Sequence, residues 1–230
     1  MGCFLINTIP LKMLAHIRTT LSKIEKAILE HPTWFEFSKK RNDGRLNSIE
    51  DEDVVANYLH GHPDLAGLLV KKSDDNREFG DFGIAGAVAV PCNIKVISDS
   101  TTSGSNSCGP TKLIGYTFQR PCRDHNAIAR IMNDLESKGY DTFEPSLYGL
   151  VLISKETKKC WIGTMDELPA DCISTNPSNP LQITFPSSRV SRTSKEYIAL
   201  LISKLDEYYE KKGKPWEIRL AARKVAATVK

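Results

Sequence analysis

The sequence contains no long apolar run. None of its hydrophobic stretches approaches the ~20 residues that a transmembrane helix requires, so we expect no membrane-spanning segment. The first six residues, Met-Gly-Cys-Phe-Leu-Ile, show no basic stretch, no extended apolar core and no small-residue cleavage site, which argues against a signal peptide. A membrane partner is therefore not expected.

Several motifs that mark nucleotide-binding proteins and common hydrolases are also missing. The chain has no G-x-x-x-x-G-K-[ST] loop, and its Gly83-Ile-Ala-Gly86 stretch lacks the G-x-G-x-x-G spacing of a dinucleotide-binding turn. Neither H-E-x-x-H nor G-x-S-x-G occurs. We therefore expect no nucleotide cofactor, and the zinc proteases and serine hydrolases that carry those motifs are excluded.

The six cysteines form no C-x-x-C pair, and nothing else in the chain is typical of a secreted protein. Reduced thiols in a cytoplasmic protein are therefore expected. The formal net charge of +3 is mildly basic. It is compatible with a polyanionic partner and does not require one.

The length of 230 residues suits one well-buried core. Hydrophobic residues make up 40% of the chain and charged residues 26%, as in ordinary globular proteins. We expect a single catalytic domain over residues 1–230, with an N-terminal helical segment at about residues 1–45.

Hydrophobic periodicity predicts the order of the secondary-structure elements. Helices are expected over residues 11–30, 48–60, 111–119, 125–138 and 194–211, and strands within 81–97 and at 147–154, 159–163 and 181–185. Ser48 is expected to cap the second helix, and Pro215 to open a last one. Turns or loops are expected at residues 41–45, 72–80 and 98–109. This order predicts an α/β fold with a central mixed β-sheet flanked by helices.

One short stretch places an acid, an amide and a lysine on two expected strands. Asp81 opens the first strand, and Asn93 and Lys95 stand two positions apart on the second. Alternation puts Asn93 and Lys95 on one face, and Asp81 joins them if the strands pair. Phosphodiester hydrolysis uses oxygen ligands for a divalent metal beside a lysine that orients water and stabilises charge. A turn aspartate and a surface lysine would produce the same pattern.

A glutamate on the second expected helix adds to this set. On a helical wheel Glu52 falls between Leu59 and Ala56, in the apolar face, whereas Glu50 falls close to the opposite side. A carboxylate that faces the interior is costly unless it is paired or binds a metal. Glu52 is therefore a candidate site residue, although a bond to the helix N-terminus or to a structural arginine would also explain its position.

Three stretches together resemble the PD-(D/E)XK nuclease superfamily, and within it the type II restriction endonucleases. They are residues 44–52, residues 81–95, and residues 179–185 followed by residues 192–197. Each stretch is short, and the resemblance rests on their order and spacing, which anchor most of the chain between residues 44 and 212.

The resemblance implies a restriction-endonuclease-like fold and a bacterial homodimer that cleaves double-stranded DNA at a palindromic site with Mg²⁺. Asp81 and Lys95 match the first acid and the lysine of the family motif. Asn93 stands where the family usually has Asp or Glu, and its amide oxygen brings a metal no charge. Glu52 is the first candidate for the extra carboxylate, and Glu78 and Glu50 are further candidates.

The polar loop at residues 98–109 directly follows the lysine strand, and in the resembled family this region approaches DNA. Ser105 and Asn106 are candidates for contacts to phosphates or base edges, although a disordered linker would have the same composition. Lys112, Arg189 and Arg192 are expected phosphate contacts.

Two alternatives remain open at this point. Asn93 could mark lost metal binding in a catalytically silent DNA-binding protein on the same fold. The chain could also be a PD-(D/E)XK nuclease of repair or resolvase type. The sequence defines neither the recognition site nor the position of the cut.

Overall fold

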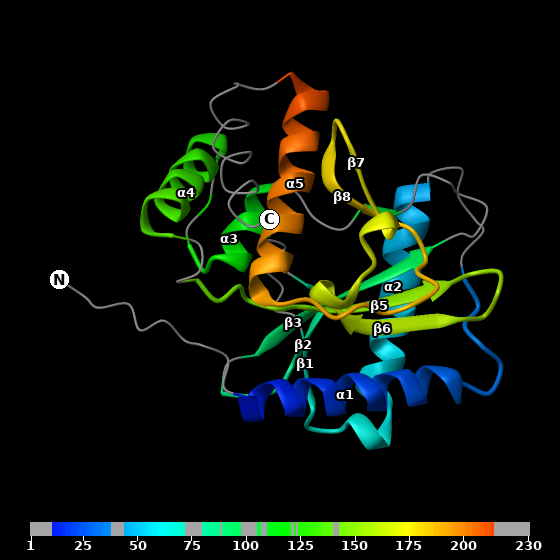
Figure 1. Ribbon diagram of the computed structural model, residues 1–230. Helices are drawn as coiled ribbons and strands as arrows, with labels where there is room; N and C mark the ends of the chain where they lie inside the picture. Colours follow the sequence, from blue (N-terminus) through cyan, green and yellow to red (C-terminus); the bar gives the residue numbers. More distant parts are fainter. Residues whose placement is uncertain are drawn as a thin grey trace.

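The computed structural model describes residues 11–37, 44–71, 80–87, 89–97, 105–106, 110–120, 122, 124–139 and 143–213 (Figure 1). The helices are α1 Leu11–Leu29, α2 Gly44–Gly61, α3 Pro110–Thr117, α4 His125–Lys138 and α5 Ser194–Lys212. The strands are β1 Leu69–Lys71, β2 Phe82–Ile84, β3 Val90–Ile97, β4 Ser105–Asn106, β5 Gly149–Ser154, β6 Cys160–Thr164, β7 Ile173–Asn176 and β8 Asn179–Ile183. Short 3₁₀ turns lie at Pro63–Leu65, Met165–Glu167 and Ala170–Cys172.

A mixed sheet of five strands forms the centre of the molecule, in the order β1-β2-β3-β5-β6. Only β3 and β5 run parallel, and the other neighbours are antiparallel. A parallel pair needs a long crossover, and here the chain passes through α3 and α4 between β3 and β5. The fold is therefore α/β with a mixed sheet, as the element order predicts.

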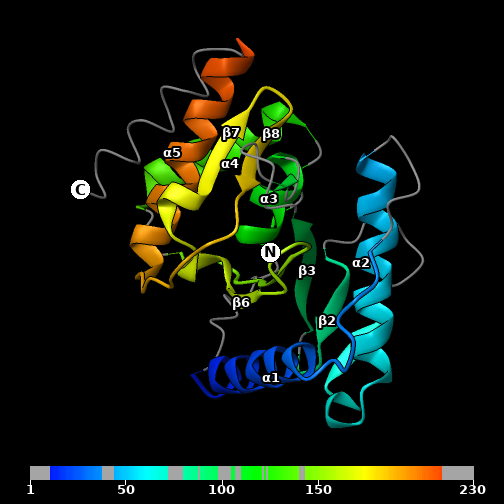
Figure 2. The same cartoon turned by 90° about the vertical axis from the view of Figure 1, so that its right-hand side faces the viewer.

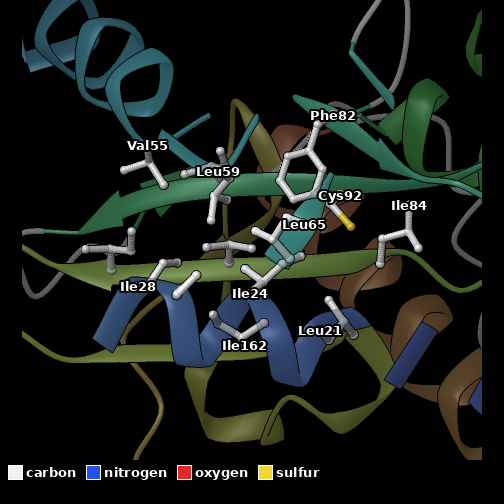
Figure 3. Packing of buried hydrophobic residues seen from close by; sticks show 14 of the residues in the cluster. Leu21, Ile24, Ile28, Val55, Leu59, Leu65, Phe82, Ile84, Cys92 and Ile162 are labelled. Atoms are coloured by element: carbon white, nitrogen blue, oxygen red, sulfur yellow. The ribbon is translucent and has the colours of Figure 1, made fainter. Parts of the chain in front are cut away.

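Helices α1 and α2 cover one face of this sheet. Leu21, Ile24 and Ile28 of α1 recur at helical spacing, and all are buried against the strands. Figure 3 shows them meeting Phe82 and Cys92 of the β2–β3 hairpin in one cluster. Each such side chain stabilises the fold by about 1.5–3 kcal/mol when it is fully buried. This packing holds β3, which carries the candidate site, between two helices and its neighbouring strands.

The other face of the sheet packs against α3, α5 and a second, three-stranded sheet. This second sheet has the order β4-β8-β7 and lies beside α5 in both views (Figures 1 and 2). Leu150 and Leu152 of β5 meet Leu113 of α3, Leu201 of α5 and Leu181 of β8 there. The two faces of β3 therefore point into two different hydrophobic clusters.

Helix α5 begins and ends at well-defined caps. The Thr193 hydroxyl accepts the Glu196 N–H, and the Glu196 carboxylate accepts the Thr193 N–H in return. These bonds lower the pKa of Glu196. At the other end Gly213 has a φ of 63°, a left-handed conformation that glycine adopts without steric cost. The expected helix over residues 194–211 is confirmed.

Most of the predicted elements are confirmed, and the structure corrects the others. Residues 44–45 of the expected turn belong to α2, and residues 105–106 of the expected loop form β4. Helix α2 begins at Gly44, so Ser48 lies inside the helix and is not its cap. Strands β1 and β7 were not predicted. Both are short, and the Ser-Thr-Asn composition of β7 is typical of loops. Pairing with β8 and packing against α5 make β7 a strand, and neither contact is visible in its local sequence.

Parts of several predicted loops, and the last predicted helix, lie outside the described residues. They are residues 41–43, 72–79, 98–104 and 107–109, and the helix expected from Pro215. Within the described residues, no helix combines the length and the apolar character needed to cross a lipid bilayer.

Candidate active site

The β2–β3 hairpin brings Asp81 to the middle of β3. Phe82 pairs with Cys92, so Asp81 and Asn93 stand one register step further along the same antiparallel pair. The Asp81 backbone N–H donates to the Cys92 carbonyl at 2.7 Å. Asp81 Oδ2 accepts the Ile94 N–H at 2.6 Å. The predicted pairing of the two strands is confirmed, and it places Asp81 beside the residues it was expected to join.

Asn93 and Lys95 lie on the same face of β3, as alternation predicts. Their partners across the parallel pair are Leu150 and Leu152, whose side chains point into the cluster formed with α3 and α5. Asn93 is 6% exposed and Lys95 is 8% exposed. Polar side chains are rarely buried to this degree without a partner or a ligand. The site is therefore an interior polar set rather than a surface pair.

Glu52 of α2 reaches this set and pairs with Lys95. The Lys95 Nζ lies 2.8 Å from Glu52 Oε1, and the two side chains are 10% and 14% exposed. Val55, one turn further along α2, packs in the same cluster as Ile94, so the helix lies along β3. In the described residues β2 pairs with β3 only over Val90–Cys92, which lets Glu52 approach Lys95 past the strand edge. The expectation that Glu52 faces inward is confirmed.

The donor atoms in this set suit a hard divalent cation. Carboxylate oxygens of Asp81 and Glu52 are the ligands that Mg²⁺ prefers in proteins. Asp81 Oδ2 accepts a hydrogen bond from the Ile94 N–H, whereas Asp81 Oδ1 has no hydrogen bond within the described residues. No three His, Cys, Asp or Glu side chains in that part of the chain stand close enough to hold a metal together. Water, substrate oxygens or the Asn93 amide would have to complete the coordination shell.

Cys92 is the one nucleophilic side chain next to these residues in the sequence of β3. Its side chain is fully buried on the opposite face, toward α1 and α2. Burial raises the pKa of the thiol far above its ordinary value, and the nearby Asp81 carboxylate acts in the same direction. The thiol therefore remains protonated at neutral pH, which argues against a cysteine nucleophile at this place.

A second ion pair lies next to the first and was not anticipated from the sequence. Asp51 is 1% exposed, and its Oδ2 lies 2.5 Å from Lys155 Nζ in the β5–β6 turn. The Lys155 backbone N–H donates to the carbonyl of Ile97, the last residue of β3, at 3.0 Å. Asp51 stands four residues before Val55 and so belongs to the buried helix face, which is the signal that could have revealed it. The adjacent acids Asp51 and Glu52 of α2 thus pair with two lysines from different segments. Asp51 pairs with Lys155 of the β5–β6 turn, and Glu52 pairs with Lys95 of β3.

Replacing Lys155 by methionine is expected to lower the free energy of unfolding by about 3 kcal/mol, because it removes the cation beside a fully buried carboxylate. Methionine retains most of the apolar stem, so packing is largely preserved. Urea denaturation of Lys155→Met, Asp51→Asn and the double variant would measure the coupling. Lys159→Met, at an exposed position of the same turn, is the matched control. Equal losses at Lys155 and Lys159 would contradict the importance of the pair.

The two arginines expected to contact phosphates are engaged with the protein itself. Arg192 Nη1 donates to the carbonyls of Asp166 and Leu168, at 2.7 and 2.6 Å. The Arg189 guanidinium lies 5.1 Å from the centre of the Trp161 ring and within 3.4 Å of Glu167. These bonds tie the segment after β8 to the end of β6. Their use as phosphate contacts stays a prediction, and it would require part of this bonding to be given up.

The other predicted contact residues are placed only in part. Ser105 and Asn106 form β4 and pair with Ile183 and Gln182 of β8, and their side chains lie outside the described ones. Lys112 is exposed on α3. Of the two reserve carboxylates, Glu50 is half-buried and Glu78 lies outside the described residues. The structure therefore pairs Glu52 with Lys95, and it places Asp81 beside Asn93 and Ile94 on the same hairpin.

Comparison with known proteins adds no relative to this picture. No model of a known protein family matches the chain, and a search of curated proteins finds no match. The function is consequently inferred from the residues of the site and from their geometry.

Proposed function

We propose that the chain is a Mg²⁺-dependent endonuclease that hydrolyses phosphodiester bonds in double-stranded DNA. In this proposal it is a type II restriction endonuclease of the PD-(D/E)XK superfamily, with a restriction-endonuclease-like fold. A homodimer would act on a short palindromic site, since a two-fold symmetric protein matches a two-fold symmetric sequence. Restriction-modification defence in the bacterial cytoplasm is the corresponding biological setting.

The observation that carries the proposal is the pairing of Glu52 with Lys95 on β3, one residue away from Ile94, whose backbone N–H donates to Asp81. Glu52 and Lys95 are 43 positions apart, and they come from different elements, yet their charged groups lie 2.8 Å apart in the protein interior. Burying charges is expensive, and a buried salt bridge often contributes little net stability. A largely buried glutamate–lysine pair next to a partly buried aspartate is therefore better explained by chemistry than by stability, and its donor types are those that phosphodiester hydrolysis requires.

Each residue has a role that follows from its position. Asp81 and Glu52 supply carboxylate oxygens for the cation. When bound, Mg²⁺ would neutralise charge on the scissile phosphate and favour ionisation of a water. The Lys95 ammonium is positioned to stabilise the negative charge that develops on the phosphate and to orient the attacking water. The hydrogen bond from Ile94 fixes the Asp81 carboxylate, so its free oxygen is oriented before the substrate arrives.

Cleavage of a long phage DNA of known sequence tests the proposal. We expect discrete bands when the purified protein is incubated with Mg²⁺ and intact DNA when EDTA is present. A Mg²⁺-dependent smear would indicate a nuclease without sequence preference. Faster cleavage of branched than of linear DNA would indicate a repair or resolvase enzyme. DNA that remains intact across a series of divalent metals would overturn the proposal in favour of a catalytically silent DNA-binding protein.

A further inference from the structure

Asn93 carries a buried hydrogen-bond donor that no described residue uses. Its side chain is only 6% exposed, and Nδ2 has no partner within the described part of the structure. Its neighbour across the parallel pair, Leu150, is apolar. Most buried polar groups in native proteins are paired, because an unpaired donor loses its hydration without compensation. An apolar residue would suit this position better in the free protein, which points to a ligand that completes the bond.

The charges around Asn93 indicate what kind of ligand fits. Asp81 and Glu52 are carboxylates and Lys95 is an ammonium, so the set carries a net charge of minus one before any cation binds. An acid at position 93 would make the net charge of the set minus two. With one divalent cation, the native set becomes net positive, whereas the acidic version would be neutral. The native set is therefore the better match for a singly charged phosphodiester.

The amide and the ammonium also lie where one anion could meet both. Asn93 and Lys95 are two positions apart on the same strand face, which separates their Cα atoms by roughly 6.5–7 Å. Amide and ammonium N–H groups both donate, and a phosphodiester offers two non-bridging oxygens that accept. An amide oxygen as a metal ligand would bring no charge, and it would leave the N–H groups to be satisfied elsewhere.

We propose that Asn93 binds the substrate rather than the metal: its Nδ2 donates to a non-bridging oxygen of a DNA phosphodiester whose charge is balanced by Lys95. The departure from an acid at this position is then an adaptation to the phosphate. The identity of the phosphodiester as duplex DNA rests on the proposed function. The observation that Asn93 Nδ2 is unpaired within the described residues is independent of the proposed function.

Asn93→Leu tests this, since leucine has a similar shape and no donor. We expect its affinity for a labelled pool of short random-sequence duplexes in EDTA, measured by fluorescence anisotropy, to fall about tenfold. The midpoint of thermal unfolding without DNA should rise by about 2–4 °C, because the unpaired donor is gone. Asn133→Leu, at an exposed position of α4, is the matched control and should leave DNA affinity unchanged.

Asn93→Asp separates a substrate contact from a metal ligand. If Asn93 contacts the substrate, the wild-type protein should bind DNA in EDTA more tightly than either variant. The Asn93→Asp variant should bind more weakly than Asn93→Leu. If Asn93→Leu instead keeps its DNA affinity in EDTA and needs more Mg²⁺ for half-maximal cleavage, Asn93 is a metal ligand and the inference is overturned. Failure of the wild-type protein to bind the duplex pool would overturn it as well.

The outcomes also distinguish this inference from the proposed function. A wild-type protein that binds DNA without cutting it, with weaker binding and higher thermal stability in Asn93→Leu, would refute the endonuclease and support the phosphate contact. A wild-type protein that cuts DNA, with unchanged binding in Asn93→Leu, would support the endonuclease and refute the contact.

Discussion

Lys95→Met is expected to lower the single-turnover cleavage rate by about 100- to 1000-fold, because in the proposed mechanism it removes the cation that stabilises the developing charge on the phosphate. The ammonium is held within 2.8 Å of Glu52 at a site that is nearly closed to solvent. Methionine keeps the length of the side chain and its apolar stem, so the loss isolates the charge. Cleavage of phage DNA at saturating enzyme and Mg²⁺ gives the rate.

A structural explanation of this loss can be tested separately. Removing Lys95 leaves the Glu52 carboxylate without its cation, which should also lower thermal stability. The double variant Lys95→Met/Glu52→Gln should recover much of that stability and none of the activity. Lys23→Met, at an exposed position of α1, serves as the control for loss of one positive charge. Cleavage at the native rate in Lys95→Met would remove this residue from the mechanism.

Asp81→Asn is expected to reduce cleavage by about 1000-fold while preserving the fold, since it deletes the charge of a proposed metal ligand. The Asn amide oxygen is still able to accept the Ile94 N–H, which Asp81 Oδ2 now accepts at 2.6 Å. Thermal stability should therefore remain close to that of the wild type. Asp81→Ala should lose the same activity, and it should lose in addition about 1 kcal/mol of stability with the hydrogen bond.

The metal dependence of Asp81→Asn provides the decisive measurement. If Asp81 holds the cation, the half-maximal Mg²⁺ concentration for cleavage should rise, and high Mg²⁺ should restore part of the rate. Asp53→Asn, at an exposed position of α2, should change neither value. A rate in Asp81→Asn that matches the wild type at every Mg²⁺ concentration would show that Asp81 only caps the end of the strand ladder.

The parts of the site that were predictable from the sequence depend on short-range geometry. Asp81 and Asn93 are twelve positions apart and stand side by side on the paired strands, and strand alternation alone places Asn93 and Lys95 on one face. The inward orientation of Glu52 follows from its spacing to Val55 on a helix, whose period is known. In each case neighbouring positions and a fixed period determine the arrangement.

Contacts between distant segments were not predictable in this way. The pairing of Asp51 with Lys155 depends on how α2 lies against the β5–β6 turn, and the sequence near either residue does not encode that. The strand character of Ile173–Asn176 depends on β8 and α5 in the same way. Arg189 and Arg192 appeared as free phosphate contacts because their carbonyl, carboxylate and aromatic partners come from other segments.

The amino-acid order alone determines an acid, an amide and a lysine on a hairpin, and a glutamate on the inner face of a helix. The tertiary structure decides that the helix lies along β3, that Glu52 pairs with Lys95, and that the Asn93 amide is buried with an unused donor. The physical reason is that backbone periodicity fixes the direction of a side chain. Burial, charge pairing and the cost of an unpaired polar group arise only when separate elements pack together.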